Sequence, residues 1–87
     1  MKKKCIIIED QLPAQRILKK YIQDIPDLDL VASYTDALSA LKMLQQQSIE
    51  LLFLDINLPK ISGLNFLRTL HIPPKVIITT AYPEYAV

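Results

Sequence analysis

The sequence has a single cysteine, a formal net charge of only +1 and no long apolar run near its start. One cysteine cannot form an internal disulfide, and Cys5, inside the apolar residues 5–8, is expected to be a small buried hydrophobic side chain. Those residues, bounded by lysines at 2–4 and by Glu9, are too few for a signal peptide or a membrane span. We therefore expect a cytoplasmic protein without membrane contact. The small net charge gives no reason to expect direct contact of this chain with nucleic acid.

The length allows one domain. Of the 87 residues, 51% are hydrophobic and 22% are charged, which is the composition of an ordinary globular protein. A chain of this length is only marginally able to bury a sufficient core. It contains no internal repeat, low-complexity tract or linker. We therefore expect residues 1–87 to form a single domain.

Short apolar runs alternate with segments of helical periodicity. Apolar and β-branched residues predict strands at 5–8, 28–34, 51–54 and 75–80. Three helices are predicted between them, and the residues expected on their buried faces are Ala14, Ile17, Leu18, Tyr21, Ile22 and Ile25, then Ala37, Leu38, Leu41 and Leu44, then Leu64, Leu67 and Leu70. Strands that alternate with helices predict an α/β fold of right-handed βαβ units with a parallel sheet.

Local signals support these boundaries. Pro26 ends the first helix, Thr35 and Asp36 are expected to cap the second, and Ser62 the third. The second strand is less regular, because Val31 interrupts the alternation that residues 28, 30, 32 and 34 would otherwise make.

Polar side chains stand at the carboxyl ends of three predicted strands. They are Glu9, Asp10, Asp55, Asn57 and Thr80. Because the loops leaving the strands of an open α/β sheet form a crevice at that edge, we expect these residues to meet in one site. Carboxylates close together repel one another, so such a cluster either raises a pKa or binds a divalent cation. Oxygen ligands without a nearby histidine or cysteine favour Mg²⁺.

Four of these residues also have a simpler interpretation. Asp55 could be a turn former, and Glu9 and Asp10 could cap the following helix. Thr79 and Thr80 could serve strand propensity alone, which we prefer for Thr79. Since side chains alternate along a strand, only one of the two threonines can face the site.

The strand-end motifs resemble the receiver domain of two-component response regulators. The motifs that carry the resemblance are Glu9-Asp10, then Asp55-Ile56-Asn57-Leu58-Pro59 with Gly63, then Val76-Ile77-Ile78-Thr79-Thr80-Ala81. They occur in the order and at the βα positions that this family uses, and they span the whole chain. The ending, residues 80–87, is similar to receivers that precede a LytTR-type DNA-binding domain. The resemblance implies a flavodoxin-like, CheY-like fold with helices on both faces of the sheet.

The resemblance also implies a function. Asp55 would accept a phosphoryl group from a phosphohistidine of a sensor histidine kinase, and Thr80 would turn toward that group as the switch hydroxyl. Glu9, Asp10 and Asp55, with the backbone carbonyl of Asn57, would hold Mg²⁺. Such a protein is a signalling domain rather than an enzyme, and a DNA-binding output domain is expected in the full-length protein.

The chain departs from a complete receiver after its fourth strand. A receiver has a fifth strand that ends in a lysine, and two further helices, none of which is found here. Lys75 starts the fourth strand, too far from Thr80 to replace that lysine, and nothing in the sequence shows that Lys60 reaches the site. We therefore expect an incomplete receiver over residues 1–87 that switches poorly. Residues 75–80 would form an unpaired edge strand, through which we expect the protein to self-associate.

Two other functions stay open at this point. One is a purely structural, self-associating receiver fragment without phosphorylation activity. The other is a Mg²⁺-dependent phosphohydrolase that uses Asp55 as its nucleophile. Asn57 argues against the phosphohydrolase, because such enzymes use a second acid at this position for proton transfer and an amide cannot do this.

Overall fold

A computed structural model describes residues 2–79. The elements in chain order are β1 (Lys3–Ile8), α1 (Leu12–Gln23), β2 (Leu28–Tyr34), α2 (Ala37–Gln46), β3 (Leu51–Asp55), α3 (Gly63–Arg68) and β4 (Lys75–Thr79). The predicted alternation of strands and helices is confirmed. No helix within the described residues is long and apolar enough to cross a membrane.

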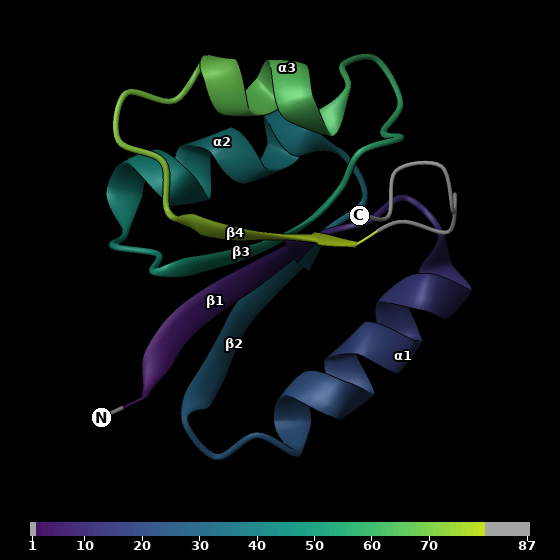
Figure 1. The fold of residues 1–87 in the computed structure, drawn as a ribbon, viewed down its shortest axis with the longest axis vertical. Coiled ribbons are helices and arrows are strands. Elements are labelled where there is room, and N and C mark those ends of the chain that lie inside the picture. Colours follow the sequence, from purple (N-terminus) through teal and green to yellow (C-terminus); the bar gives the residue numbers. More distant parts are fainter. Residues whose placement is uncertain (1, 80–87) are drawn as a thin grey trace.

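The four strands form one parallel sheet in the order β2-β1-β3-β4. The carboxyl ends of the strands therefore lie along one edge of the sheet (Figure 1). In the register of the ladder, Ile8 lies beside Leu54, and Asp55 lies beside Thr79. Within the described residues, β4 is an outer strand of the sheet.

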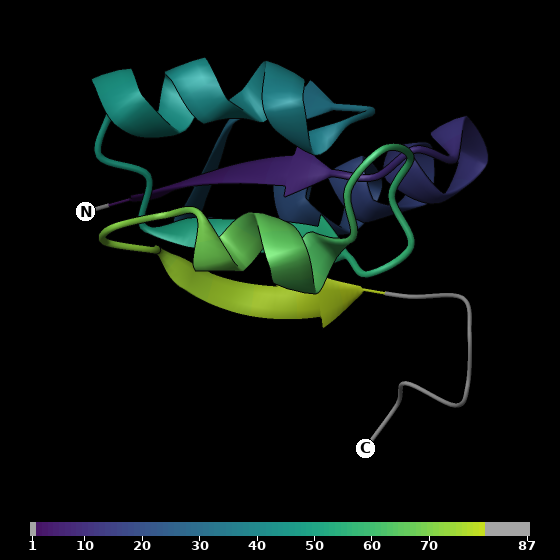
Figure 2. The same cartoon turned by 90° about the horizontal axis from the view of Figure 1, so that it is seen from above.

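Helices cover both faces of the sheet, as predicted. Helices α2 and α3 lie on one face and α1 lies on the other, beneath β1 and β2 (Figures 1 and 2). This arrangement agrees with the expectation of a CheY-like fold with helices on both faces of the sheet.

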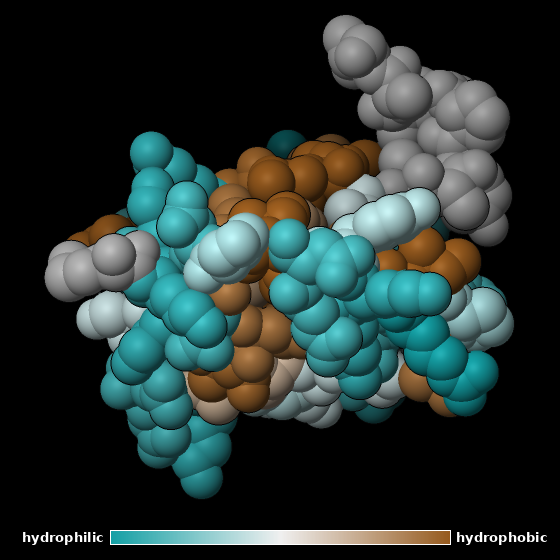
Figure 3. Space-filling view, turned by 90° about the horizontal axis from the view of Figure 1, so that it is seen from below, coloured by the Kyte–Doolittle hydropathy of each residue, from teal (hydrophilic) through white to brown (hydrophobic). Residues whose placement is uncertain are grey.

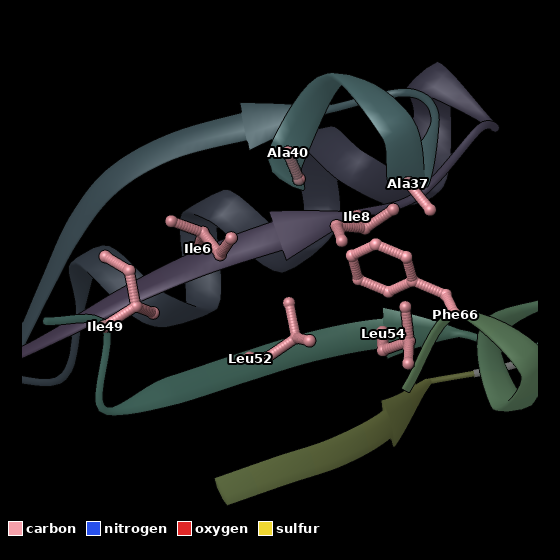
Figure 4. Packing of buried hydrophobic residues seen from close by; sticks show 8 residues of the cluster. All are labelled: Ile6, Ile8, Ala37, Ala40, Ile49, Leu52, Leu54 and Phe66. Atoms are coloured by element: carbon pink, nitrogen blue, oxygen red, sulfur yellow. The ribbon is translucent and has the colours of Figure 1, made fainter. Parts of the chain in front are cut away.

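Each face of the sheet has its own apolar core, and β1 contributes to both. Ile6 and Ile8 pack with Leu52, Leu54 and Phe66 in the core beneath α2 and α3 (Figure 4). The alternate residues of β1 pack on the α1 side, where Cys5 and Ile7 meet Ile22 and Phe53. Side chains that alternate between the faces of a strand produce this division.

Cys5 is fully buried, as predicted. Its Sγ lies 3.6 Å from the carbonyl oxygen of Asp29, and burial raises the pKa of the thiol above its ordinary value. Both observations agree with the prediction of a small core residue.

A bulge explains the irregular pattern of β2. Cys5 pairs with Leu30, but the next residue, Ile6, pairs with Ala32, so Val31 is the extra residue in the ladder. Leu30 accordingly packs in the α1 core, whereas Ala32 packs in the core under α2 and α3. The expectation that residues 28, 30, 32 and 34 share one face was therefore wrong, because an extra residue reverses the alternation beyond it.

Only part of the apolar stripe of α1 packs against the sheet. Ile22 is buried, and Leu18 packs beside it, but Ile17 and Tyr21 are 57% and 65% exposed. Ile25, predicted to be buried, lies beyond the end of α1 and is also exposed. Figure 3 shows this side of the molecule, where apolar patches alternate with hydrophilic surface. The period of the sequence identified the helix, but it does not say how much of the apolar face finds a neighbour.

Two leucines predicted to be buried are exposed. Leu38 of α2 and Leu64 of α3 are 55% and 49% exposed, whereas Ala40 and Phe66 are fully buried. In α3, a six-residue helix, the side that faces the sheet carries Phe66, two positions from the leucine that was expected there. A helix this short gives too few turns for its period to fix the buried side.

Candidate functional site

Three carboxylates gather where β1 and β3 end. Glu9 and Asp55 are buried, with 6% and 5% of their surface exposed, and Asp10 is half-buried. One carboxylate oxygen from each of the three lies within 4.8 Å of those of the other two. The structure thus brings together the three acids that the sequence placed at one edge of the sheet.

Backbone groups hold Glu9 and Asp55 in place. The N–H of Glu9 donates to the carbonyl of Tyr34 at 2.9 Å, which continues the ladder one residue past β1. The Glu9 carboxylate accepts from the N–H of Gln11 at 3.2 Å, and Oδ1 of Asp55 accepts from the N–H of Asn57 at 3.2 Å. Both acids therefore project from a rigid strand end rather than from a free loop.

The loop after β3 folds back closely onto Asp55. The N–H of Gly63 donates to the carbonyl of Ile56 at 2.9 Å, and Ser62 caps α3 by accepting from the N–H of Asn65 at 3.1 Å. A Cβ atom at position 63 would lie only 2.5 Å from the carbonyl oxygen of Asp55. The glycine is thus required for close packing of the first turn of α3 on the site.

The crowding of carboxylates is visible in their electrostatics. Burial raises the pKa of Glu9 from 4.5 to about 7, and the neighbouring carboxyl of Asp55 adds to this rise. Burial and a like charge both disfavour a carboxylate anion. In the absence of a cation, Glu9 therefore keeps its proton close to neutral pH.

The donor set fits a hard divalent cation. All three side chains offer oxygen, and Mg²⁺ takes carboxylate oxygens at 2.0–2.1 Å together with water. Oxygens bound to one such ion lie up to about 4 Å apart, so small side-chain rotations are enough to close this cluster. A divalent charge would also offset the repulsion from Asp55 that adds to the raised pKa of Glu9.

The sequence comparison decides the family. Residues 5–87 match the response regulator receiver domain. The chain belongs to this family.

Relatives of this receiver domain include transcriptional regulators. Protein MrkE of Klebsiella pneumoniae is 37% identical over 90 residues, covering 99% of this chain and 33% of MrkE. The transcriptional regulatory protein YpdB of Escherichia coli K12 is 35% identical over 88 residues, covering 97% of this chain and 36% of YpdB. The receiver domain thus spans about a third of the length of these curated relatives.

Solved receiver structures share its fold. The crystal structure of the response regulatory domain of MrkE from K. pneumoniae superposes with a TM-score of 0.82 at 34% identity, covering 95% of this chain and 70% of that one. The MaeR response regulator bound to beryllium trifluoride gives a TM-score of 0.82 at 32% identity, covering 92% of this chain and 68% of that one.

The roles predicted for two other site residues, Asn57 and Thr80, stay predictions. Asn57 is exposed, and its contact with the site is the bond from its N–H to Asp55, so its carbonyl as a metal ligand stays a prediction. Thr80 lies outside the described residues, so its role as the switch hydroxyl also stays a prediction. Its neighbour Thr79 pairs with Asp55 in the ladder, and the buried Thr79 Oγ1 has no hydrogen-bond partner among the described residues.

Of the two lysines weighed from the sequence, Lys75 lies away from the acid cluster of this receiver domain. Lys75 pairs with Leu51 at the far end of β4, about 13 Å along the strand from Thr79. Lys60 is exposed in the loop after β3 and has a φ of 70°. The pKa of Asp36 is lowered, mainly by the hydrogen bond from the N–H of Ser39, and the positive charge of Lys60 adds to this lowering. The prediction that Lys75 cannot serve the site agrees with this register.

One buried polar residue beside the site was not predicted from the sequence. Gln15 of α1 is 5% exposed, and its side-chain Nε2 donates to the carbonyls of Glu9 and Tyr34. The spacing could have revealed it. Position 15 lies three residues before Leu18 and seven before Ile22, so the helical period predicts an apolar residue at position 15, and the sequence has a glutamine there.

Proposed function

We propose that this receiver domain accepts a phosphoryl group on Asp55 from a phosphohistidine of a sensor histidine kinase, with Mg²⁺ bound by Glu9, Asp10 and Asp55. The observation that carries the proposal is the cluster of three carboxylates within 4.8 Å, at the ends of β1 and β3, in a chain of this family. The backbone carbonyl of Asn57 completes the proposed protein ligands.

The transfer exchanges one bond to phosphorus for another. A carboxylate oxygen of Asp55 attacks phosphorus, the bond from phosphorus to the histidine nitrogen breaks, and the product is an acyl phosphate. Oδ1 of Asp55 accepts from the N–H of Asn57, and this bond helps to hold the carboxylate in place. The bound cation supplies positive charge that offsets the charge developing on the transferred group. Glu9 and Asp10 contribute by holding that charge at the strand ends.

The proposed output follows from the relatives. YpdB is named a transcriptional regulatory protein, and we propose that this receiver domain likewise controls a DNA-binding output, of the LytTR type, in the cytoplasm. Thr80 would report the phosphoryl group. The added charge of about −1.5 to −2 provides the local change that such a hydroxyl can follow. We propose a signalling domain rather than an enzyme that turns over phosphate esters.

Intact mass spectrometry tests the proposal. We expect the chain to gain one phosphoryl group when it is incubated with acetyl phosphate and Mg²⁺. Asp55→Asn should gain none, while Asp29→Asn, an exposed substitution on β2, should react like the unchanged chain. A gain that persists in Asp55→Asn, or that needs no Mg²⁺, would refute the assignment. Continuous release of phosphate from added phosphate esters would favour the hydrolase instead.

We also propose that the chain self-associates through β4, which would pair with β4 of a second copy. Ile77 and Ile78 point to opposite faces of the sheet and are 45% and 39% exposed, so both faces of this outer strand carry uncovered apolar surface. Residues 76–79 contain no charge that would oppose pairing. A second copy offers the same apolar strand, and antiparallel pairing about a twofold axis would satisfy both edges.

Sedimentation equilibrium at micromolar concentration tests this association. We expect a dimer that Ile77→Lys weakens, because the substitution places a charge within the paired strands. Ile72→Lys is the matched control, since Ile72 is 91% exposed in the loop before β4 and should leave the dimer unchanged. A monodisperse monomer of 9.9 kDa for the unchanged chain would refute the proposal.

A further inference from the structure

Gln15 occupies a position where its chemistry is unexpected. It is one of three buried polar or charged residues among those the structure describes, and the other two, Glu9 and Asp55, belong to the acid cluster. On α1 it lies in the stripe that continues through Leu18 and Ile22 toward the sheet. An apolar side chain would pack there without cost, whereas a buried amide must find hydrogen-bond partners.

The partners of Gln15 are the ends of two strands. Its Nε2 donates one hydrogen to the carbonyl of Glu9 at 3.2 Å and the other to the carbonyl of Tyr34 at 3.1 Å. Tyr34 is the last residue of β2, and its carbonyl also accepts the N–H of Glu9. One amide group thus ties β1 and β2 together where the parallel ladder ends.

Holding the carbonyl of Glu9 fixes more than one residue. The peptide unit between Glu9 and Asp10 is planar, so a bond to its carbonyl oxygen also sets the direction in which the chain enters Asp10. Glu9 is then restrained at three points, by Tyr34 through its N–H, by Gln15 through its carbonyl and by Gln11 through its carboxylate. These restraints act on the backbone that carries two of the three clustered acids.

We propose that Gln15 is a positioning residue of the cation site, holding the Glu9–Asp10 backbone so that both carboxylates face Asp55. The inference rests on the proposed function, since it assigns Gln15 a role in binding Mg²⁺. Gln15 does not touch the cation in this arrangement. It acts through the peptide between the two acids, in the way that groups behind metal ligands orient them.

A titration with MgCl₂ tests the role of Gln15. The dissociation constant is read from amide chemical shifts of the ¹⁵N-labelled 87-residue chain, and the same spectra show that each variant is folded. Gln15→Met keeps the length of the side chain and removes both donors, and we expect it to weaken Mg²⁺ binding about tenfold. Gln23→Met, an exposed substitution on the same helix, should bind like the unchanged chain.

A second control separates positioning from stability. Ile22→Ala, on the same helix, lowers stability through the α1 core without touching the backbone of Glu9, and we expect its affinity for Mg²⁺ to stay within twofold of the unchanged chain. Equal affinity for the unchanged chain and Gln15→Met would refute the role of Gln15 alone. An equal loss in Gln15→Met and Ile22→Ala would also refute it. An unchanged chain that binds no Mg²⁺ would instead refute the proposed function, and this role with it.

Discussion

Replacing Gly63 with alanine tests how closely α3 packs on the site. The added Cβ would lie 2.5 Å from the carbonyl oxygen of Asp55, 3.1 Å from the Cα of Ile56 and 3.2 Å from the Cγ of Leu54. Ordinary contact begins near 3.4 Å, so the first of these distances must open by about 0.9 Å. The obstacle is backbone and cannot rotate away. Either the start of α3 or the end of β3 must move.

The expected magnitude is the difference between two opposing effects. Alanine in place of glycine stabilises a helix interior by about 1 kcal/mol when nothing obstructs it, and this is an upper limit for Gly63, the first residue of α3. Overpacking of a rigid site costs about 1–3 kcal/mol, and we take the upper end here because the obstructing atom belongs to the backbone. We therefore expect Gly63→Ala to lower the free energy of unfolding by about 2 kcal/mol.

Urea unfolding followed by far-ultraviolet circular dichroism measures this change. With a slope of about 1 kcal/mol/M for a small domain, the midpoint should fall by about 2 M. Asn65→Ala is the matched control, because Asn65 is exposed on the same helix and should lose little stability. A Gly63→Ala protein as stable as the unchanged chain, or more stable, would show that helix propensity outweighs the contact with Asp55 and would refute the reasoning.

Three further changes test the site and the core. Because the folded chain keeps the Glu9 proton up to a pKa of about 7, against 4.5 when unfolded, stability should fall as pH rises between these values. Without divalent ions, Glu9→Gln should therefore be more stable than the unchanged chain at pH 7.5, but not at pH 4.5. Equal urea midpoints for the two proteins at pH 7.5 would contradict this. Phe66→Ala should lower the free energy of unfolding by about 3–5 kcal/mol, because Phe66 is 1% exposed. Leu64→Ala should lower it by less than about 1 kcal/mol, because Leu64 is exposed. Similar losses for the two variants in thermal unfolding would refute the assigned core. Asp36→Ala should lower the free energy of unfolding by about 1 kcal/mol, because Asp36 caps α2 by accepting from the N–H of Ser39 at 2.8 Å. An unchanged urea midpoint would argue against this cap.

The sequence predicts the order of elements and the location of the site because these depend on local properties. Runs such as 5–8 and 51–54 are apolar throughout, as strands buried on both faces must be. Parallel strands place their carboxyl ends at one edge whatever their exact packing, so Glu9, Asp10 and Asp55 were expected on the same edge. They meet there because β1 and β3 are neighbours in the sheet. The caps at Asp36 and Ser62 are equally local, since each accepts from an N–H three residues ahead.

The rest was decided by tertiary contacts. Which side of a helix is buried depends on what lies opposite, so Phe66 rather than Leu64 enters the core, and Ile17 stays exposed although it fits the period of α1. The bulge at Val31 follows from the pairing of β2 with β1 and cannot be read from β2 alone.

The same distinction applies to the site. Sequence alone determined which acids this receiver domain places at the ends of β1 and β3, because the end of each strand is fixed by local pattern. Only the tertiary structure decided that Gln15 would tie two strand ends together and that Gly63 would pack against the carbonyl of Asp55. The bonds of Gln15 join segments that are far apart in the sequence, and the contact of Gly63 needs a loop that folds back on its own strand. The periodicity of the sequence encodes neither of these distances.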